Sequence, residues 1–111
     1  MSQQLEDRFT AACKRLYDAG LKLYPQYRAA ALLGMVGRYG GKEAADRILS
    51  WPAPMEGFTR LLLSGVKNLQ LSLEYLVLQN PWRSLFTPAQ LAVVRQRLLE
   101  VGGTLPPEDI A

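Results

Sequence analysis

The chain has 111 residues and a mass of 12.4 kDa, the size of one small domain. Hydrophobic residues make up 49 % of the sequence and charged residues 21 %, which excludes wholesale disorder and collagen-like repeats. There is no histidine and one cysteine. These counts exclude nucleophiles paired with histidine, zinc sites built from Cys and His, and an intrachain disulfide.

Positive charge is concentrated in the middle of the sequence. The formal net charge is +3, but all 13 Lys and Arg residues lie between Arg8 and Arg97, where only five acidic residues accompany them and the net charge is +8. The other acidic residues lie close to the two ends. This distribution predicts either one positive face or a well-mixed solvated surface.

Nothing in the sequence predicts targeting to a membrane. The first residues lack the basic and apolar regions of a signal peptide, and no apolar run approaches the roughly 18 residues that cross a bilayer. The lone Cys13 fits a reducing compartment. We therefore expect a soluble cytoplasmic protein without membrane association.

The first part of the chain predicts two helices. Between residues 5 and 23, apolar residues recur at steps of three and four, and Pro25 ends that helix. Residues 25–39 are apolar nearly all round, which predicts a central helix. Gly34 and Gly37 lower helix propensity, so we expect a neighbouring helix to approach closely at both positions.

Two further short helices are expected before residue 66. The first runs from Lys42 to Ser50 after the stop signal Gly40-Gly41, and the second starts at Pro54 or Met55 and ends at Gly65. The inward side of the first of these carries Ala44, Ala45, Ile48 and Leu49.

The segment from Leu69 to Leu78 fits two structures. Its alternating apolar residues suit a strand, whereas Ser72 suits a helix N-cap and leucine favours helix. A single strand would have no partner in this chain, so we expect a helix over residues 73–79.

The last predicted helix has the clearest boundaries. Thr87 and Gln90 form a capping box around Pro88, and Gly102-Gly103 ends the helix. The inner side is expected to carry Leu91, Val94, Leu98 and Val101, and the outer side Arg95, Gln96, Arg97 and Glu100. The predicted fold is all-α: a single compact domain of five or six short helices over residues 1–104, in which the second and last helices supply much of the core, followed by a flexible tail, 105–111.

No residue pattern predicts catalysis, a cofactor or a metal ion. Glu43 and Asp46 share a helix face, but Lys42 and Arg47 flank them, so we expect ion pairs on a solvated surface. The glycines of residues 34–41 lack the Gly-Lys-Ser/Thr of a phosphate loop. Residues 27–50 fit a helix-turn-helix, although the second helix is short and its charges largely cancel. We predict that the protein is not an enzyme.

Exposed basic and aromatic residues are the candidate binding groups. If the first and last helices are neighbours, their basic residues merge into one patch for phosphates or for an acidic protein. A tryptophan beside an arginine is typical of a contact point for a protein partner. The candidate partner-binding residues are Lys14, Arg15, Lys22, Trp82, Arg83, Arg95 and Arg97.

Five stretches of the chain carry a recognisable pattern: Gly40–Ala45, Gly57–Leu61, Leu71–Leu78, Trp82–Thr87 and Arg95–Leu98. With them, residues 34–100 resemble a group of short, uncharacterised helical proteins of bacteria and their mobile elements. The resemblance implies a bacterial or phage context and carries no activity or site residues.

Two functions follow as hypotheses. The first is non-catalytic binding to a protein, for example by a phage or mobile-element protein that inhibits or regulates a host enzyme. The second is nucleic-acid binding through a basic surface formed by Lys14, Arg15, Lys22, Arg95 and Arg97. Self-association through an apolar helix face, giving a homo-oligomer, is a further possibility.

Overall fold

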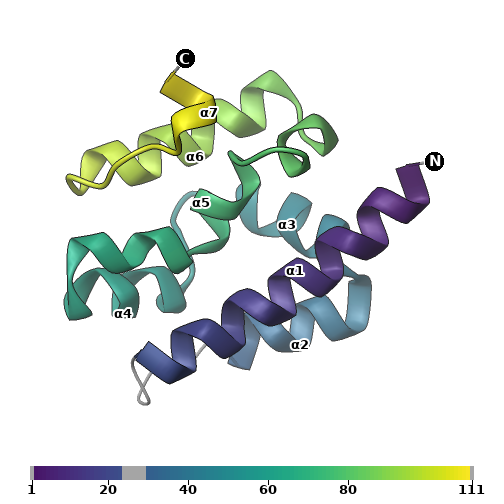
Figure 1. The fold of residues 1–111 in the computed structure, drawn as a ribbon, viewed down its shortest axis with the longest axis horizontal. Helices are drawn as coiled ribbons and strands as arrows, with labels where there is room; N and C mark the ends of the chain where they lie inside the picture. The colour runs from purple at the N-terminus through teal and green to yellow at the C-terminus, as the bar shows by residue number, and fades with distance from the viewer. Residues whose placement is uncertain (1, 24–29, 111) are drawn as a thin grey trace.

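The computed structural model describes residues 2–23 and 30–110 (Figure 1). The helices are α1 (Ser2–Leu23), α2 (Ala30–Tyr39), α3 (Gly41–Leu49), α4 (Glu56–Ser64), α5 (Leu73–Val77), α6 (Pro88–Glu100) and α7 (Pro107–Ile110), with 3-10 segments η1 (Val66–Leu71) and η2 (Trp82–Leu85). No strand occurs in the described residues, which confirms the all-α single domain. The helix end predicted at Pro25 lies outside the described residues.

Two of the predicted N-caps are present. The Ser72 hydroxyl accepts a hydrogen bond of 3.1 Å from the Tyr75 amide, which explains why the apolar run after residue 72 forms a helix. At α6 the Thr87 hydroxyl accepts from the Gln90 amide, and the Gln90 side chain accepts from the Thr87 amide. The capping box is therefore complete.

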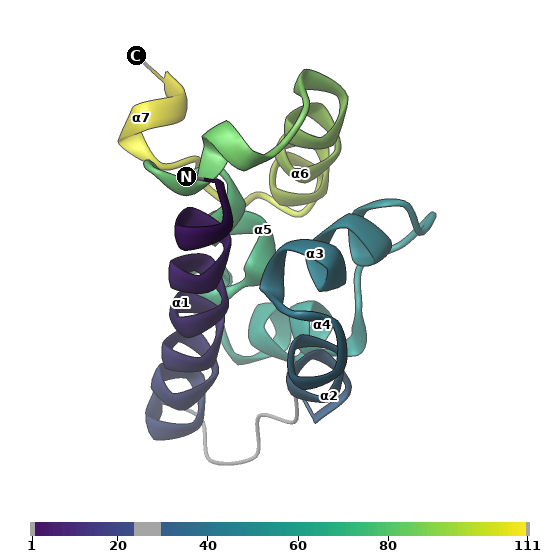
Figure 2. The ribbon, with the colours of Figure 1, turned by 90° about the vertical axis from the view of Figure 1, so that its right-hand side faces the viewer.

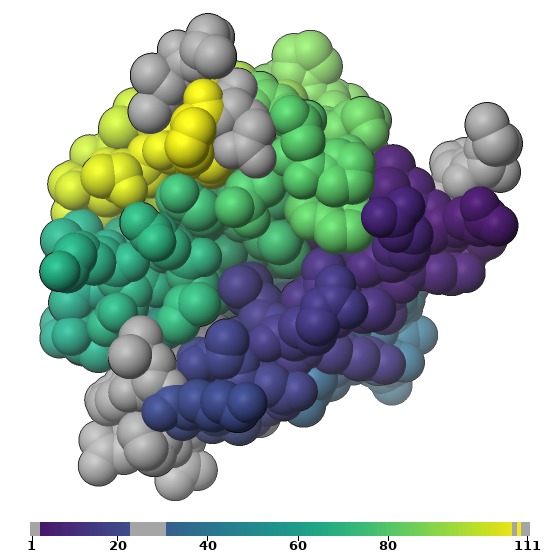
Figure 3. Space-filling model, viewed as in Figure 1, coloured from purple at the N-terminus to yellow at the C-terminus, as the bar shows by residue number. Residues whose placement is uncertain are grey.

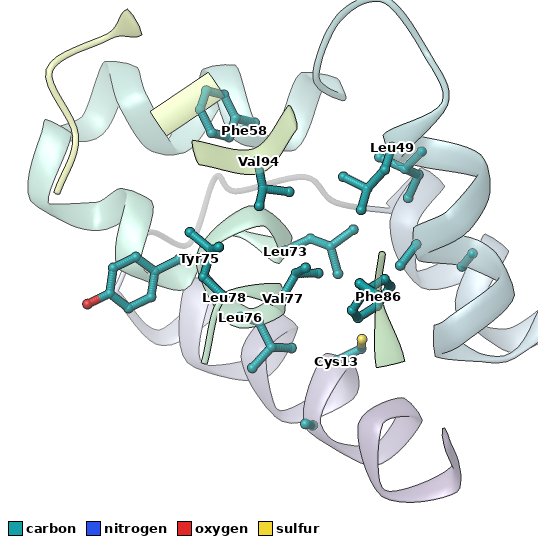
Figure 4. Close-up of a cluster of buried hydrophobic side chains, with 14 of the residues drawn as sticks. Cys13, Leu49, Phe58, Leu73, Tyr75, Leu76, Val77, Leu78, Phe86 and Val94 are labelled. Atoms are coloured by element: carbon teal, nitrogen blue, oxygen red, sulfur yellow. The ribbon is translucent and has the colours of Figure 1, made fainter. Parts of the chain in front are cut away.

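The centre of the molecule is α5, and this corrects the sequence prediction. All five residues of α5 are buried, and the helix packs on α6, α1 and the two 3-10 segments. Its side chains belong to one buried cluster that also contains Cys13, Leu49, Phe58 and Val94 (Figure 4). In α2, expected to be central, only Val36 is buried among the residues whose side chains are described. Four of the ten residues of α2 are alanine or glycine, which gain little from burial.

The close helix approach occurs at a different glycine from those predicted. Among the described residues, a methyl group added at Gly34 or Gly37 would meet no atom of another helix within 4 Å, so the prediction for these two positions is wrong. At Gly41 it would lie 2.9 Å from the Thr10 Cα and 3.0 Å from the Phe9 ring. Glycine is therefore required where α1 crosses the start of α3.

Helix α3 is held at both ends by side chains from other helices. At its start the Thr10 hydroxyl of α1 accepts a 2.8 Å hydrogen bond from the Gly41 amide. At its end the Arg97 guanidinium of α6 donates to the carbonyl oxygens of Ile48 (3.3 Å) and Trp51 (2.7 Å). The Gly41 amide is one of the donors that a helix start leaves without a partner inside the helix, and Arg97 ties the end of α3 to α6. The inward side predicted for α3 is confirmed.

Arg97 is buried, so the prediction that it faces solvent is wrong. Only 7 % of the residue is exposed, and its guanidinium pairs with the Glu74 carboxylate of α5 at 3.2 Å. Burial raises the pKa of Glu74, while the hydrogen bond from its backbone and the charge of Arg97 act in the opposite direction. A cation at this position is tolerated because a carboxylate and two carbonyl oxygens surround it.

The last part of the chain also differs from its predicted form. Val101, expected on the inner side of α6, is 36 % exposed, whereas Val94 and Leu98 are buried as predicted. Within the segment predicted as a loose tail, α7 places the Asp109 carboxylate 2.7 Å from Arg95 and 2.8 Å from Arg83. The hydrogen bond from Arg95, followed by that from Arg83, lowers the pKa of Asp109.

Candidate functional site

The predicted basic residues do not form one surface. On α1, Lys14, Arg15 and Lys22 are exposed, and none has a carboxylate within ion-pair distance in the described part of the chain. Helix α1 packs on α2, α3 and α5, whereas α6 packs on α5 and α3 (Figures 1 and 2). The basic residues of the first and last helices are therefore separated.

Trp82 and Arg83 contact the protein itself. The Trp82 ring lies 5.8 Å from the Phe9 ring, and the Arg8 guanidinium lies 5.9 Å above it. Arg83 donates to the Leu78 carbonyl oxygen as well as to Asp109. Trp82 therefore packs against α1, and Arg83 links the end of α5 to α7.

A groove lies between α2 and the end of α3. It encloses about 610 Å³, and the loop after α3 projects from the same side of the molecule (Figure 2). We name it the α2–α3 groove. Its lining residues are Ala31, Gly34, Met35, Arg38, Tyr39, Arg47, Ser50 and Trp51.

One end of the α2–α3 groove is aromatic and basic. The Arg47 guanidinium lies 4.0 Å from the centre of the Tyr39 ring, and that of Arg38 lies 5.8 Å from it. Arg47 also pairs with Glu43 at 2.9 Å, whereas no carboxylate of the described residues pairs with Arg38. The lining itself contains two cations and no carboxylate.

Trp51 presents an exposed ring on a fixed backbone. The residue is 41 % exposed, but its carbonyl oxygen accepts the 2.7 Å hydrogen bond from Arg97. Its backbone is thus tied to the core through the Arg97–Glu74 pair. A rigid aromatic side chain loses little conformational entropy when it binds a partner, which makes Trp51 a favourable contact residue.

A second, acidic hollow lies on the other side of Tyr39. It encloses about 340 Å³, and its lining includes Glu6, Asp7, Glu43 and Asp46. Asp46 pairs with Lys42 at a short distance and accepts from Gln90, as Glu43 pairs with Arg47, so the predicted ion pairs of α3 are confirmed. Among the residues that the structure describes, no group of acidic side chains is placed to hold a metal ion.

Cys13 has the properties of a core residue. The thiol is buried, and burial raises its pKa to about 12. A thiolate is therefore scarce near neutral pH, and the side chain packs as a small apolar group (Figure 4).

Comparison with family models, curated proteins and solved structures finds no match to the chain. The resemblance described from the sequence stays a prediction. None of the helices in residues 2–23 and 30–110 is long and apolar enough to cross a bilayer.

Sequence reasoning did not identify the α2–α3 groove. Trp51 and Arg38 were not among the predicted binding residues, although both line it. The sequence feature that could have indicated the groove is the pair of glycines, Gly34 and Gly37, in the apolar α2. If both sides of this helix were packed, larger residues would be expected at these positions. This pattern is compatible with burial or exposure, and only the tertiary structure distinguishes them.

Proposed function

We propose that this protein is a non-catalytic binding protein and that a segment of a partner protein occupies the α2–α3 groove. The observation that carries the proposal is the exposed Trp51 ring, on a backbone held by Arg97, beside a hollow of about 610 Å³. Leu33 of α2 is 37 % exposed and adds apolar surface to that helix.

The residue types in the groove favour a protein partner. Tryptophan, tyrosine and arginine contribute most often to the binding energy of protein interfaces, and all three occur here. The lining offers neither a carboxylate nor a thiol for acid–base or nucleophilic chemistry. The groove is suited to holding a ligand in place.

The biological setting belongs to the same proposal. A bacterial or mobile-element protein in the cytoplasm that binds a host enzyme through this groove would inhibit or regulate that enzyme. Support for this setting comes from the sequence resemblance over residues 34–100.

The test is affinity capture from a nuclease-treated bacterial lysate with three proteins. They are the wild type, Gly34→Trp, which fills the groove from a position with open space around it, and Ala92→Trp, which adds the same ring on the exposed side of α6. We expect the wild type and Ala92→Trp to retain one protein in stoichiometric amount and Gly34→Trp to lose it. Equal retention by Gly34→Trp, or recovery of nucleic acid alone, contradicts the proposal.

A second candidate function is nucleic-acid binding on the outer side of α1, which crosses the face of the molecule shown in Figure 3. It is favoured by Lys14, Arg15 and Lys22, which are exposed and form no ion pair with any described carboxylate. It predicts a gel shift at low salt that weakens steeply as salt increases and is lost in Lys14→Glu/Arg15→Glu. Absence of a shift at low salt removes this candidate.

A further inference from the structure

We infer that the segment bound in the α2–α3 groove is acidic, with carboxylates beside a large apolar side chain; this inference rests on the proposed function. Arg38 and Arg47 are the charged residues of the groove lining, and Arg38 has no carboxylate partner in the described residues. A carboxylate of the bound segment would form an ion pair with Arg38, with a charge-assisted hydrogen bond between them.

The apolar part of the segment is indicated by the opposite end of the groove. Ala31 and Gly34 leave the α2 backbone uncovered there, while Met35 and the Trp51 ring provide apolar surface. A leucine or aromatic side chain placed between them would bury this surface and remove it from water. Carboxylates next to such a side chain would then lie over the two arginines.

The neighbouring acidic hollow limits the occupant to a short acidic stretch. Tyr39 lines both hollows, so the acidic one begins where the groove ends. A nucleic acid that followed the groove would carry its phosphates toward a hollow in whose described lining the four carboxylates outnumber the one cation, Lys42. Repulsion between like charges disfavours such a continuous polyanion, whereas a protein segment can change from acidic to neutral or basic residues at this point.

The experiment is selection from a random-peptide library on the immobilised wild type and three variants. Arg38→Glu reverses the unpaired charge, and Gly34→Trp fills the groove. Arg60→Glu makes the same reversal on α4, outside the groove lining, and serves as the control. It also breaks the ion pair with Glu56, which lies at the surface and contributes little to stability.

We expect peptides from the wild type and from Arg60→Glu to be enriched in Asp and Glu beside Leu, Ile or Phe. The acidic enrichment should disappear on Arg38→Glu, and the Kd of a wild-type peptide should rise about tenfold or more on that variant. Gly34→Trp should select none of these peptides.

The outcomes separate this inference from the proposed function. Peptides that require an open groove but lack acidic enrichment, or that bind Arg38→Glu equally well, contradict the acidic partner and leave the proposed function intact. Peptides that also bind Gly34→Trp, or the absence of selected peptides, contradict both. A dimer seen by sedimentation and lost in Gly34→Trp would show that a second copy of the chain fills the groove, and it would overturn the inference.

Discussion

Arg97 illustrates how one side chain determines the arrangement of several elements. Its guanidinium lies inside the molecule, pairs with Glu74 and binds two carbonyl oxygens at the end of α3. The neighbouring arginine, Arg95, binds Asp109 instead. Two arginines that the sequence assigns to one outer surface therefore have different structural roles, because the boundary of the buried side of α6 lies between them.

Leu98 and Leu99 also lie on either side of the boundary between the buried and exposed sides of α6. Leu98 is 0 % exposed and Leu99 is 56 % exposed. We expect Leu98→Asp to lower the free energy of unfolding by about 4 kcal/mol or more, or to prevent folding, because it buries an unpaired charge. Leu99→Asp should stay within about 0.5 kcal/mol of wild type. Urea denaturation of both variants checks this, and similar losses would show that the inner side of α6 is wrongly placed.

Substitution of Gly37 and of Gly41 by alanine should change the stability of the protein in opposite directions. Gly37 is exposed in the last turn of α2, and no atom of another described helix lies near its missing methyl group, whereas Gly41 faces the Thr10 backbone. We expect Gly37→Ala to stabilise the protein by about 0.5–1 kcal/mol, as alanine favours helix. Gly41→Ala should destabilise it, because α1 and α3 must separate. A gain in melting temperature for both variants would contradict the close approach at Gly41.

At the scale of elements, α3 depends on contacts from distant helices. Its nine residues lack a side-chain cap of their own, and Gly40 precedes it with a φ of 82°. The N-terminal cap comes from Thr10 on α1, 31 residues earlier in the chain. A sequence pattern identifies local caps such as Thr87, whereas a cap supplied by another helix becomes visible only when the two helices are placed together.

The cap from Thr10 has a measurable effect. Thr10→Val keeps the shape of the side chain but removes the acceptor for the Gly41 amide. We expect the free energy of unfolding to fall by about 1 kcal/mol, with most of this loss restored in Thr10→Ser, which retains a hydroxyl. Denaturant titration compares the three proteins, and equal stability of the valine and serine variants would exclude a capping role.

The pairing of α5 with α6 introduces a dependence on pH. Because burial raises the folded-state pKa of Glu74, its contribution to stability is full below the ordinary value of 4.5 and is lost as the pH rises through the folded-state pKa. Asp109 has a lowered pKa and loses its contribution only as the pH falls through that lower value, so the two carboxylates titrate in different windows.

Glu74→Gln tests this pH dependence. We expect the wild type to lose stability as the pH rises above about 4.5 and the variant, whose amide does not titrate, to lose much of that slope. The slope of unfolding free energy against pH is compared between the two proteins. An unchanged slope would show that Glu74 does not titrate in this range.

At the scale of the whole molecule, the sequence predicts the elements better than their positions. The all-α class, the caps at Ser72 and Thr87 and the inward side of α3 follow from local patterns, and all are confirmed. Which helix occupies the centre depends on long-range packing. The apolar helix predicted over residues 25–39 was expected there, yet the five-residue α5 fills it, because α5 buries large side chains and an ion pair.

The candidate site was less predictable than the fold. Composition and spacing identified basic and aromatic residues, but not which of them face solvent. Trp82 packs near the core while Trp51 is exposed, and both lie beside a proline in the sequence. Trp82 packs against Phe9 of α1, whereas Arg97 holds the Trp51 backbone at the edge of the α2–α3 groove. No local pattern encodes a contact between residues 46 positions apart.

The most direct test of binding in the α2–α3 groove is amide hydrogen exchange, measured for the protein alone and bound to its captured partner. If the partner segment occupies the α2–α3 groove, exchange should slow in α2 and around residues 47–51, and it should change little along the outer side of α1. Slower exchange along α1 with α2 unaffected would contradict the account.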